Sequence, residues 1–301
     1  MKAARASKKS PPPCISFKVL FIGTGRAAQG LAGAFASAGI PVAGLWSRGK
    51  KKVPGHATFG GPVAKAVAGA DVIVLAVPDT AIAATAARIA KGPGKLLTKI
   101  FVHLSGAHES GVLEPLRKRG ALTASLHPFY SFVPGVSANL RSIPFSLEGS
   151  PEAVAIIRRL MEPFGMRFAV IDPKDKPLYH AAAVFCSNFT AGLQAAADTM
   201  LRDAGVGEVD ARLMVSALLT STALNVVTKG PRDALTGPVV RGDLPTIRTH
   251  LETLRARAPH LVPPYAVLTL LLARTQGPAK LGKPFIAELH NLIARYLGPQ
   301  D

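Results

Sequence analysis

The chain has 301 residues, of which 48% are hydrophobic, and it carries 36 Lys and Arg against 18 Asp and Glu, a formal net charge of +18. The apolar fraction excludes a wholly disordered protein, and the length predicts two domains, each with its own core. Two cysteines, Cys14 and Cys186, are too few for a disulfide framework or a four-ligand zinc site, which favours a reducing, cytoplasmic location. The longest apolar stretch, Leu261–Ala273, contains two prolines and is shorter than the roughly 20 residues of a membrane-spanning helix, so we expect a soluble protein without a membrane partner.

The positive charge is concentrated in the first half of the chain. Residues 1–150 hold 19 Lys and Arg against 5 Asp and Glu, whereas residues 151–301 hold 17 against 13, and no acidic residue precedes Asp71. This asymmetry indicates either an anionic partner for the first half or a charge excess that only keeps the protein in solution.

Residues 1–16 have the composition of a disordered basic tail. Short apolar runs then alternate with helical stretches up to about residue 172, and this alternation predicts a doubly wound α/β domain with a parallel sheet over residues 17–174. The expected strands are 18–23, 42–47, a short one near 58, 71–77, 100–104, 122–126, 145–148 and 167–171. The expected helices between them are 27–38, 63–68, 82–90, 111–119 and 152–164.

Residues 175–301 show helical periodicity and no convincing strand, so we expect an all-α second domain. The predicted helices are 176–204, 209–229, 244–257, 264–274 and 285–296, with prolines near their boundaries.

The first strand leads into Gly23-Thr24-Gly25-Arg26-Ala27-Ala28, which has the form G-x-G-x-x-A. Gly23 permits a tight turn, Gly25 lets the backbone approach a pyrophosphate, and Ala28 allows close packing of helix on strand. The amide groups at the helix N-terminus can then bind the anion. Such a loop at the first strand–helix turn of a doubly wound sheet indicates a dinucleotide site; the alternative is a structural turn.

The end of the second strand carries Ser47-Arg48-Gly49-Lys50 where an NAD-specific site places an acidic residue. A hydroxyl and cations suit a 2′-phosphate, so the predicted cofactor is NADP. A solvated basic loop is the alternative, and it fits Lys51 and Lys52 better than Arg48.

Two further strand ends lie on the ligand side of the predicted sheet. Val77 and Pro78 end one strand and are expected near the nicotinamide ribose, and Asp79 after them is either part of that loop or a helix N-cap. Ser105, with Gly106, ends the next strand and is either a site residue or a turn residue.

Hydride transfer to a carbon that bears oxygen or nitrogen needs a proton donor or acceptor near that atom, and histidine is the usual choice. His127 follows a strand and precedes Pro128, while His180 opens the long helix of the second domain. Asn188 lies eight residues further, on roughly the same helix face as His180, and an Asn buried among apolar residues needs partners. Each of these three residues has a structural alternative, as a turn or helix-contact residue.

A polar segment, Leu235–Asp243, interrupts the helical domain. Its Arg241 is either an anion-binding residue or the partner of Asp243 in a salt-bridged loop.

These motifs together resemble a bacterial family that joins an N-terminal Rossmann-like domain to a C-terminal helical domain of unknown function. The resemblance covers about residues 17–297 and rests on the glycine loop, Val77–Asp79, Leu104–Gly106, Leu126–Pro128, and two segments that are specific to the family, Tyr179–Asn188 and Leu235–Asp243. The wider superfamily includes prephenate dehydrogenase, pyrroline-5-carboxylate reductase and the β-hydroxyacid dehydrogenases, whose second domains are like that of 6-phosphogluconate dehydrogenase.

The resemblance implies an NADP-binding oxidoreductase with a helical dimerisation domain. Prephenate dehydrogenases carry a similar catalytic His before Pro and a Ser on a neighbouring strand end, which match His127 and Ser105. β-Hydroxyacid dehydrogenases use a Lys and an Asn on the interdomain helix, and this chain has Asn188 but His180 where the Lys is expected.

Three functions remain open at this point. The first is an NADP-dependent oxidoreductase that acts on a small carbonyl, imine or hydroxy-acid substrate held between the domains. In that hypothesis His127 exchanges the proton, Ser105 and Asn188 orient the reacting group, and His180 is a second candidate base. The second is a non-catalytic NADP(H) sensor or partner-binding protein, and the third, which no motif supports, is a nucleic-acid binder. The apolar helical domain also predicts a homodimer.

Overall fold

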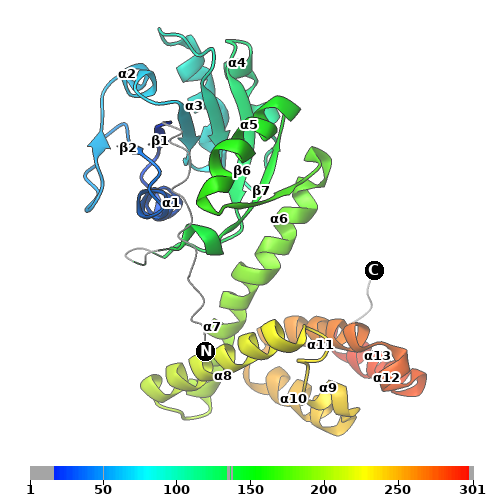
Figure 1. The fold of residues 1–301 in the computed structure, drawn as a ribbon. Coiled ribbons are helices and arrows are strands. Elements are labelled where there is room, and N and C mark those ends of the chain that lie inside the picture. The colour runs from blue at the N-terminus through cyan, green and yellow to red at the C-terminus, as the bar shows by residue number, and fades with distance from the viewer. Residues whose placement is uncertain (1–16, 50, 134–135, 137, 298–301) are drawn as a thin grey trace, which may run out of the picture. The chain divides into compact units, whose positions relative to one another are not determined.

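The computed structural model of the protein describes residues 17–49, 51–133, 136 and 138–297 (Figure 1). The predicted basic tail with Cys14, and Lys50 beside the predicted phosphate site, lie outside the described residues. Two compact units divide the chain, Met1–Asn188 and Phe189–Asp301. The first unit therefore includes the beginning of the long helix that we assigned to the second domain, and the boundary at residue 174 stays a prediction.

The first unit contains a single eight-stranded sheet with the strand order β3-β2-β1-β4-β5-β6-β7-β8. The chain first adds strands on one side of β1, namely β2 and β3, and then on the other side from β4 onward. This reversal at β1 is expected of a doubly wound α/β fold. Each strand lies where the sequence predicts it, within a few residues. The strands are β1 (Val19–Ile22), β2 (Val42–Trp46), β3 (Thr58–Phe59), β4 (Val72–Leu75), β5 (Ile100–His103), β6 (Leu122–Pro128), β7 (Pro144–Gly149) and β8 (Arg167–Val170).

One strand departs from the predicted parallel sheet. β7 pairs antiparallel with β6, whereas all other neighbours, including β7 and β8, are parallel. Parallel neighbours need a crossover connection, usually a helix. Within the described part of the link from β6 to β7 the helical structure is a short 3₁₀ turn, Leu140–Ser142, so the chain returns in the opposite direction. The antiparallel pairing places Ser146 directly opposite His127.

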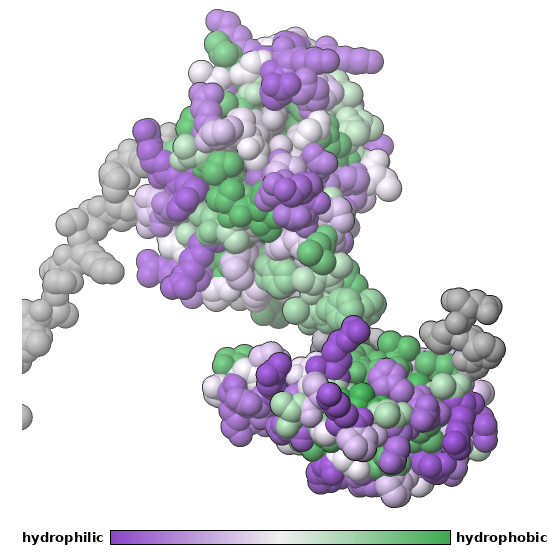
Figure 2. All heavy atoms as spheres, turned by 90° about the vertical axis from the view of Figure 1, so that its right-hand side faces the viewer, coloured by the Kyte–Doolittle hydropathy of each residue, from purple (hydrophilic) through white to green (hydrophobic). Residues whose placement is uncertain are grey.

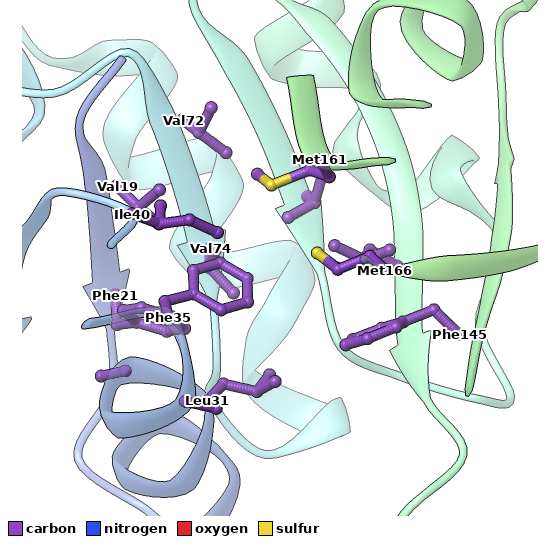
Figure 3. Packing of buried hydrophobic residues seen from close by; sticks show 14 of the residues in the cluster. Val19, Phe21, Leu31, Phe35, Ile40, Val72, Val74, Phe145, Met161 and Met166 are labelled. Atoms are coloured by element: carbon purple, nitrogen blue, oxygen red, sulfur yellow. The ribbon is translucent and has the colours of Figure 1, made fainter. Parts of the chain in front are cut away.

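Helices cover both faces of the sheet because successive residues of each strand point to opposite sides. On one face α1 (Arg26–Ser37) packs on β1 and β2 and α5 (Pro151–Met161) on β6 and β7. Their buried residues join one cluster with Val19, Phe21, Val72 and Val74, part of which Figure 3 shows. The alternate residues Leu20, Ile22, Ile73 and Leu75 meet the helices of the other face. Those helices are α2 (Val63–Ala68), α3 (Asp79–Lys91), the 3₁₀ turn Ser110–Leu113 and α4 (Glu114–Arg117).

A long helix follows β8 and a 3₁₀ turn, Pro173–Asp175. It begins as α6 (Lys176–Val184), widens into a π-helical turn at Phe185–Phe189, and continues as α7 (Thr190–Asp203). The sequence predicts an uninterrupted α-helix here, and the π turn is a departure that shifts the phase of all later residues. Such turns are rare and occur often at functional sites.

The second unit is helical, as predicted, and its core gathers Ile247, Leu251, Ala266, Leu289 and Ile293. The described helices include two short ones that periodicity could not find, α9 and α12. They are α7, α8 (Glu208–Lys229), α9 (Pro238–Arg241), α10 (Leu244–Arg257), the 3₁₀ turn Pro259–Leu261, α11 (Val262–Gln276), α12 (Pro278–Leu281) and α13 (Lys283–Leu297).

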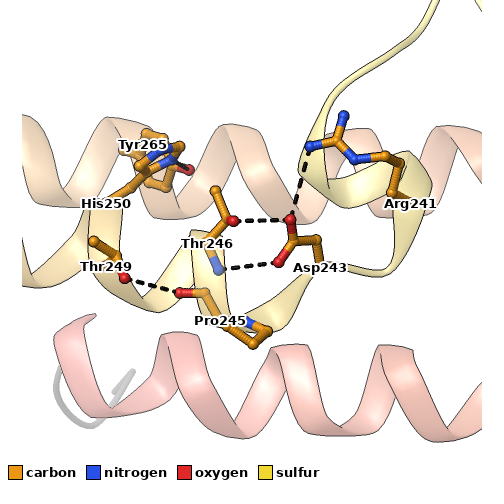
Figure 4. Close-up of polar contacts among 7 residues, drawn as sticks. All are labelled: Arg241, Asp243, Pro245, Thr246, Thr249, His250 and Tyr265. Atoms are coloured by element: carbon orange, nitrogen blue, oxygen red, sulfur yellow. Dashed lines mark hydrogen bonds and ion pairs between the residues drawn. The ribbon is translucent and has the colours of Figure 1, made fainter.

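The polar segment before α10 forms a helix cap (Figure 4). Asp243 accepts hydrogen bonds from the Thr246 amide at 3.1 Å and the Thr246 hydroxyl at 2.8 Å, and Arg241 lies 3.7 Å from its carboxylate. These bonds satisfy an amide that a helix N-terminus otherwise leaves free. The salt-bridged alternative for Arg241 therefore describes this loop.

α8 leaves most of its apolar residues exposed. By length and composition alone it could cross a membrane, whereas the longest apolar stretch of the sequence is Leu261–Ala273. Of its residues, all of which the structure describes, only Ala211 is buried. Figure 2 shows hydrophobic residues reaching the surface of both units in that view.

Candidate functional site

The glycine loop lies at the carboxyl ends of β1 and β4 and lines a cavity of about 550 Å³. Gly23 has φ +127, and a Cβ there would overlap the carbonyl oxygen of Ala76, so the turn requires glycine. At Gly25 a Cβ would meet no described atom within 4 Å, which leaves the backbone open to the cavity. Ala28 is buried against the sheet. The described lining consists of Gly23, Thr24, Gly25, Arg26, Ala27, Ala76, Val77, Pro78, Tyr130, Ser131 and Phe132.

The beginning of α1 faces this cavity without a side-chain cap. Gly25 is its N-cap residue, and no described side chain accepts a hydrogen bond from the amides of its first turn. Free amides and the positive end of the helix dipole attract an anion. Arg26 adds a cation to the lining, so the cavity suits a phosphate-bearing ligand.

Ser47 and Arg48 directly follow β2 and lie outside the described lining of the cavity. The Ser47 hydroxyl accepts a hydrogen bond from the Lys51 amide at 2.9 Å, while Arg48 is exposed. The structure thus brings Val77 and Pro78 to the glycine loop but leaves the two predicted 2′-phosphate residues at a neighbouring strand end.

Ser105 is held in a closed network of hydrogen bonds. Its hydroxyl donates to Asp79 Oδ2 at 2.8 Å and accepts from the amides of Ala107 and His108 at 3.2 and 3.0 Å. Its own amide donates to Nδ1 of His103 at 3.2 Å. Because one hydroxyl has one donor and two acceptor positions, all of them are in use. This favours the turn alternative for Ser105. Asp79 begins α3 as a first-turn residue rather than as the N-cap, which is Pro78.

His127, the penultimate residue of β6, lies in the next strand along. Its Nδ1 is 2.7 Å from the Tyr179 hydroxyl. Burial lowers the pKa of His127 to about 4, and the nearby charges of His180 and Lys176 act in the same direction, while Asp79 opposes them. The imidazole is therefore neutral near pH 7. One of its nitrogens carries a proton, and the other can accept a hydrogen bond.

His180 comes to the same place from α6. The rings of His127 and His180 are 6.1 Å apart, and both face Gly106. A Cβ on Gly106 would lie 2.7 Å from His180 Nδ1 and 3.0 Å from His127 Nε2, so only glycine leaves both nitrogens in place. His180 Nδ1 is buried and has no hydrogen-bond partner among the described residues. A buried nitrogen of this kind is costly unless a ligand or water satisfies it.

Lys176, which the sequence analysis did not single out, lies beneath this cluster. Its side chain is 1% exposed, and Nζ donates to Ser125 Oγ at 2.6 Å and to the carbonyl oxygen of Ser105 at 3.3 Å. No carboxylate among the described residues forms an ion pair with it. Burial lowers the pKa of Lys176, and Glu148, Asp79 and Glu109 oppose this effect. In the sequence nothing distinguishes it from exposed Lys174.

The expectation that Asn188 is buried is wrong. Asn188 is exposed and lies in the π-helical turn. Its apolar neighbours suggested burial, but Ala182 and Phe185 are exposed as well. The structure therefore brings His127, His180 and Ser105 together but not Asn188. It adds Gly106, Lys176 and Tyr179, of which Tyr179 could have been suspected because it precedes His180.

Two family models match the sequence. The model of a Rossmann-like domain matches residues 6–128, and the model of a domain of unknown function (DUF2520) matches residues 143–271. No curated protein matches the sequence at a significant level.

Solved structures share the fold over most of the chain. A candidate NADP oxidoreductase from Bacteroides fragilis is 24% identical with a TM-score of 0.70, and a protein from Thermotoga maritima is 25% identical with a TM-score of 0.65; each match covers 86% of this chain and 98% of the other. A Plasmodium falciparum pyrroline carboxylate reductase, solved with NADP bound, is 14% identical with a TM-score of 0.59, covering 87% of this chain and 98% of its own. The motifs predicted this combination of domains. The chain therefore contains a Rossmann-like domain followed by the domain of unknown function DUF2520.

Proposed function

We propose that the protein is an NADP(H)-dependent oxidoreductase that acts on a small carbonyl, imine or hydroxy-acid substrate. The observation that carries the proposal is the glycine-lined cavity at the ends of β1 and β4, with a neutral, half-buried His127 at the end of β6 in the same sheet. In an open α/β sheet, ligands bind at the carboxyl ends of the strands where the winding reverses. Proteins of the same fold from Bacteroides and Plasmodium are an NADP oxidoreductase candidate and an NADP-bound reductase.

The residues around the cavity fit a dinucleotide. The open backbone at Gly25 and the uncapped first turn of α1 would hold the pyrophosphate, and Val77 and Pro78 would border the nicotinamide ribose. Ser47 and Arg48 would hold the 2′-phosphate, since exposed Arg48 can reach an anion and no acidic residue ends β2. When bound, the cofactor would supply or accept the hydride.

The chain's own residues would handle the proton. His127 presents Nε2 beside Gly106, where it can give a proton to an oxygen or nitrogen or take one from it. The absence of a Cβ at Gly106 leaves both histidine nitrogens in place, and unpartnered His180 Nδ1 would accept a hydrogen bond from the reacting group or from a bound water. Ser105, whose hydrogen bonds are satisfied, would hold the loop that contains Gly106.

The cofactor assignment is tested by Arg48→Asp. Losing a charge-assisted hydrogen bond to phosphate should weaken NADPH binding by about 10-fold or more and change NADH binding by less than about 3-fold. Lys52→Asp is the matched control, because it makes the same charge change in the exposed loop beyond. Isothermal titration with both dinucleotides measures the effect, and equal losses for NADPH and NADH would contradict the assignment.

The catalytic assignment is tested by His127→Ala. We expect a loss of turnover of about 100-fold or more at an unchanged NADPH dissociation constant, since general acid–base catalysis contributes on this scale. His56→Ala, outside the cluster, is the control. The screen should cover imines, oxo acids and aldehydes; dinucleotide binding without oxidation of NADPH by any of them would favour the sensor alternative.

We also propose a cytoplasmic homodimer formed through the helical domain. Exposed apolar residues along α8 include Leu213, Leu218, Leu224 and Val227. Acidic Glu208 and Asp210 stand at one end of this helix and Lys229 at the other, so an antiparallel pairing with a second copy would bring opposite charges together.

Sedimentation velocity tests the dimer. Leu218→Glu should convert it to a monomer, and Leu97→Glu, an equally exposed leucine of the first unit, should not. If the protein is a monomer in solution and floats together with lipid vesicles, α8 binds a membrane and not a second copy.

A further inference from the structure

Tyr179 and His127 form a pair whose contacts fix both rings. The Tyr179 hydroxyl lies 2.7 Å from His127 Nδ1, and the two rings meet edge to face with centroids 5.5 Å apart. Phe129 packs on the tyrosine at 5.4 Å. Ser146, directly opposite His127 on β7, forms a hydrogen bond with the tyrosine hydroxyl. The four residues therefore lie in the order Ser146, Tyr179, His127 and Gly106.

The direction of these hydrogen bonds decides what His127 can do. A neutral imidazole has one N–H, so a proton on Nδ1 leaves Nε2 as an acceptor, and a proton on Nε2 leaves Nδ1 as an acceptor. The tyrosine hydroxyl has a single proton. It goes to His127 Nδ1 if Ser146 donates to the tyrosine oxygen, and it goes to Ser146 in the opposite arrangement.

The relative strengths of the groups favour donation toward His127. An imidazole nitrogen is a stronger acceptor than a serine hydroxyl, and a phenol is a stronger donor than an aliphatic alcohol, so Ser146 donates to the tyrosine oxygen and the tyrosine donates to His127 Nδ1.

We propose that Tyr179, oriented by Ser146, is a positioning residue that holds His127 with its proton on Nε2, the nitrogen beside Gly106, so that the resting site is set for reduction. This inference rests on the proposed function and adds the direction of the reaction. The substrate class is a carbonyl or imine whose oxygen or nitrogen needs a proton as a hydride arrives.

The proton transfers balance as follows. A hydride from a reduced nicotinamide dinucleotide forms the new C–H bond, and the π electrons of the C=O or C=N bond move to oxygen or nitrogen. That atom takes the proton from His127 Nε2 while Nδ1 takes the proton of Tyr179. Before the next turnover Nε2 regains a proton from solvent and Nδ1 returns its proton to the tyrosine. Three other titratable groups influence the pair, namely Lys176, His180 and Asp79.

The first experiment reads the tautomer without any turnover. Long-range ¹⁵N–¹H NMR of the histidine rings in the full chain at pH 7 should show His127 with a protonated Nε2 and an unprotonated Nδ1. A protonated Nδ1 would overturn the inference, whether or not the protein is an oxidoreductase. Loss of dinucleotide binding would instead defeat the proposed function and leave this readout standing.

The second experiment is Tyr179→Phe, which keeps the ring and removes the hydroxyl. We expect turnover to fall about 10- to 100-fold at an unchanged NADPH dissociation constant, and the alkaline limb of the pH–rate profile, which reports ionisation of the phenol, to disappear. Lys176 is the other basic group that acts on His127 besides His180, so Lys176→Arg, whose guanidinium stays charged, should retain the limb. An alkaline limb that survives in Tyr179→Phe would overturn the inference.

The second unit supplies a matched control variant. Tyr265 lies 2.8 Å from Nδ1 of His250 through its hydroxyl, with rings 5.8 Å apart and nearly perpendicular, and both residues are drawn in Figure 4. Tyr265→Phe removes the same kind of bond in the other unit. It should leave both turnover and the alkaline limb as they are, and an equal loss in the two variants would show a general structural effect and overturn the role of Tyr179.

Discussion

Two helices of this protein, α1 and α8, differ in how far their apolar residues are buried. α1 buries five of its twelve residues, Ala28, Leu31, Ala32, Ala34 and Phe35, on one stripe against the sheet. α8 has 22 residues and buries only Ala211, while Leu218 and Val227 are 70% and 82% exposed. Apolar spacing of three and four matches one flat partner surface, whereas α8 has apolar residues around its whole circumference. The apolar residues of α1 are therefore covered within one chain, whereas most of those of α8 are not.

The largest expected effect is in the sheet that α1 and its neighbours cover. Phe101 is fully buried in β5, and Phe101→Ala should lower the free energy of unfolding of the first unit by about 3–5 kcal/mol, because it leaves a cavity. Urea titration of the full chain measures this loss. A loss below about 1 kcal/mol would mean that truncating a buried residue of the sheet costs no more than truncating an exposed residue of α8.

Acid should weaken the same unit through a buried histidine. Burial lowers the pKa of His103 to about 4 from the 6.5 of an unfolded chain. Between these values the unfolded state binds more protons, so stability is complete above pH 6.5 and falls as pH drops, by about 3 kcal/mol at pH 4. Urea titrations from pH 7 to 4 test this. The slope should decrease by about half in His103→Gln, because buried His127 contributes in the same way, and should remain in His260→Gln, which alters an exposed residue of the second unit.

A smaller gain is expected at Thr98, the one non-glycine residue with positive φ that the described chain contains. Its φ of 69 is in the left-handed region, which costs a β-branched residue roughly 1–2 kcal/mol. Thr98→Asn should therefore raise the free energy of unfolding by about 1 kcal/mol. Thr123→Asn, in a strand, should not; a gain there as well would remove the backbone explanation.

The smallest effect should come from α8 itself. Leu218→Ala in dilute protein should change the free energy of unfolding by less than about 0.5 kcal/mol, since the side chain is exposed within one chain. The same variant at high concentration should lose more if a second copy covers the helix. Unfolding curves across a 100-fold range of concentration decide this, and identical curves at all concentrations would count against the dimer.

Local patterns predicted most of the elements and part of the site. Continuous apolar runs located β1 and β4, and the glycine loop located the cavity. The antiparallel direction of β7 could not be read from its own residues, because it depends on a connection that lacks a crossover helix. Asn188 was expected to be buried because of its apolar neighbours, of which Ala182 and Phe185 are themselves exposed. The burial of Lys176 and the closeness of Gly106 to two histidines become visible only in three dimensions, where strands far apart in the sequence bring Ser105, Ser125 and His127 together.

The burial of Lys176 has a practical consequence for chemical footprinting. Reagents that acylate amines need an accessible, unprotonated Nζ, and this one is enclosed between the ends of β5 and β6 while many other lysines are at the surface. Its labelling should therefore be slow and should follow the opening of the first turn of α6, not the reagent concentration at the surface. Mass spectrometry of the peptide containing Lys176 would then measure the rate at which that turn opens, with labelling of exposed Lys174 as the internal reference.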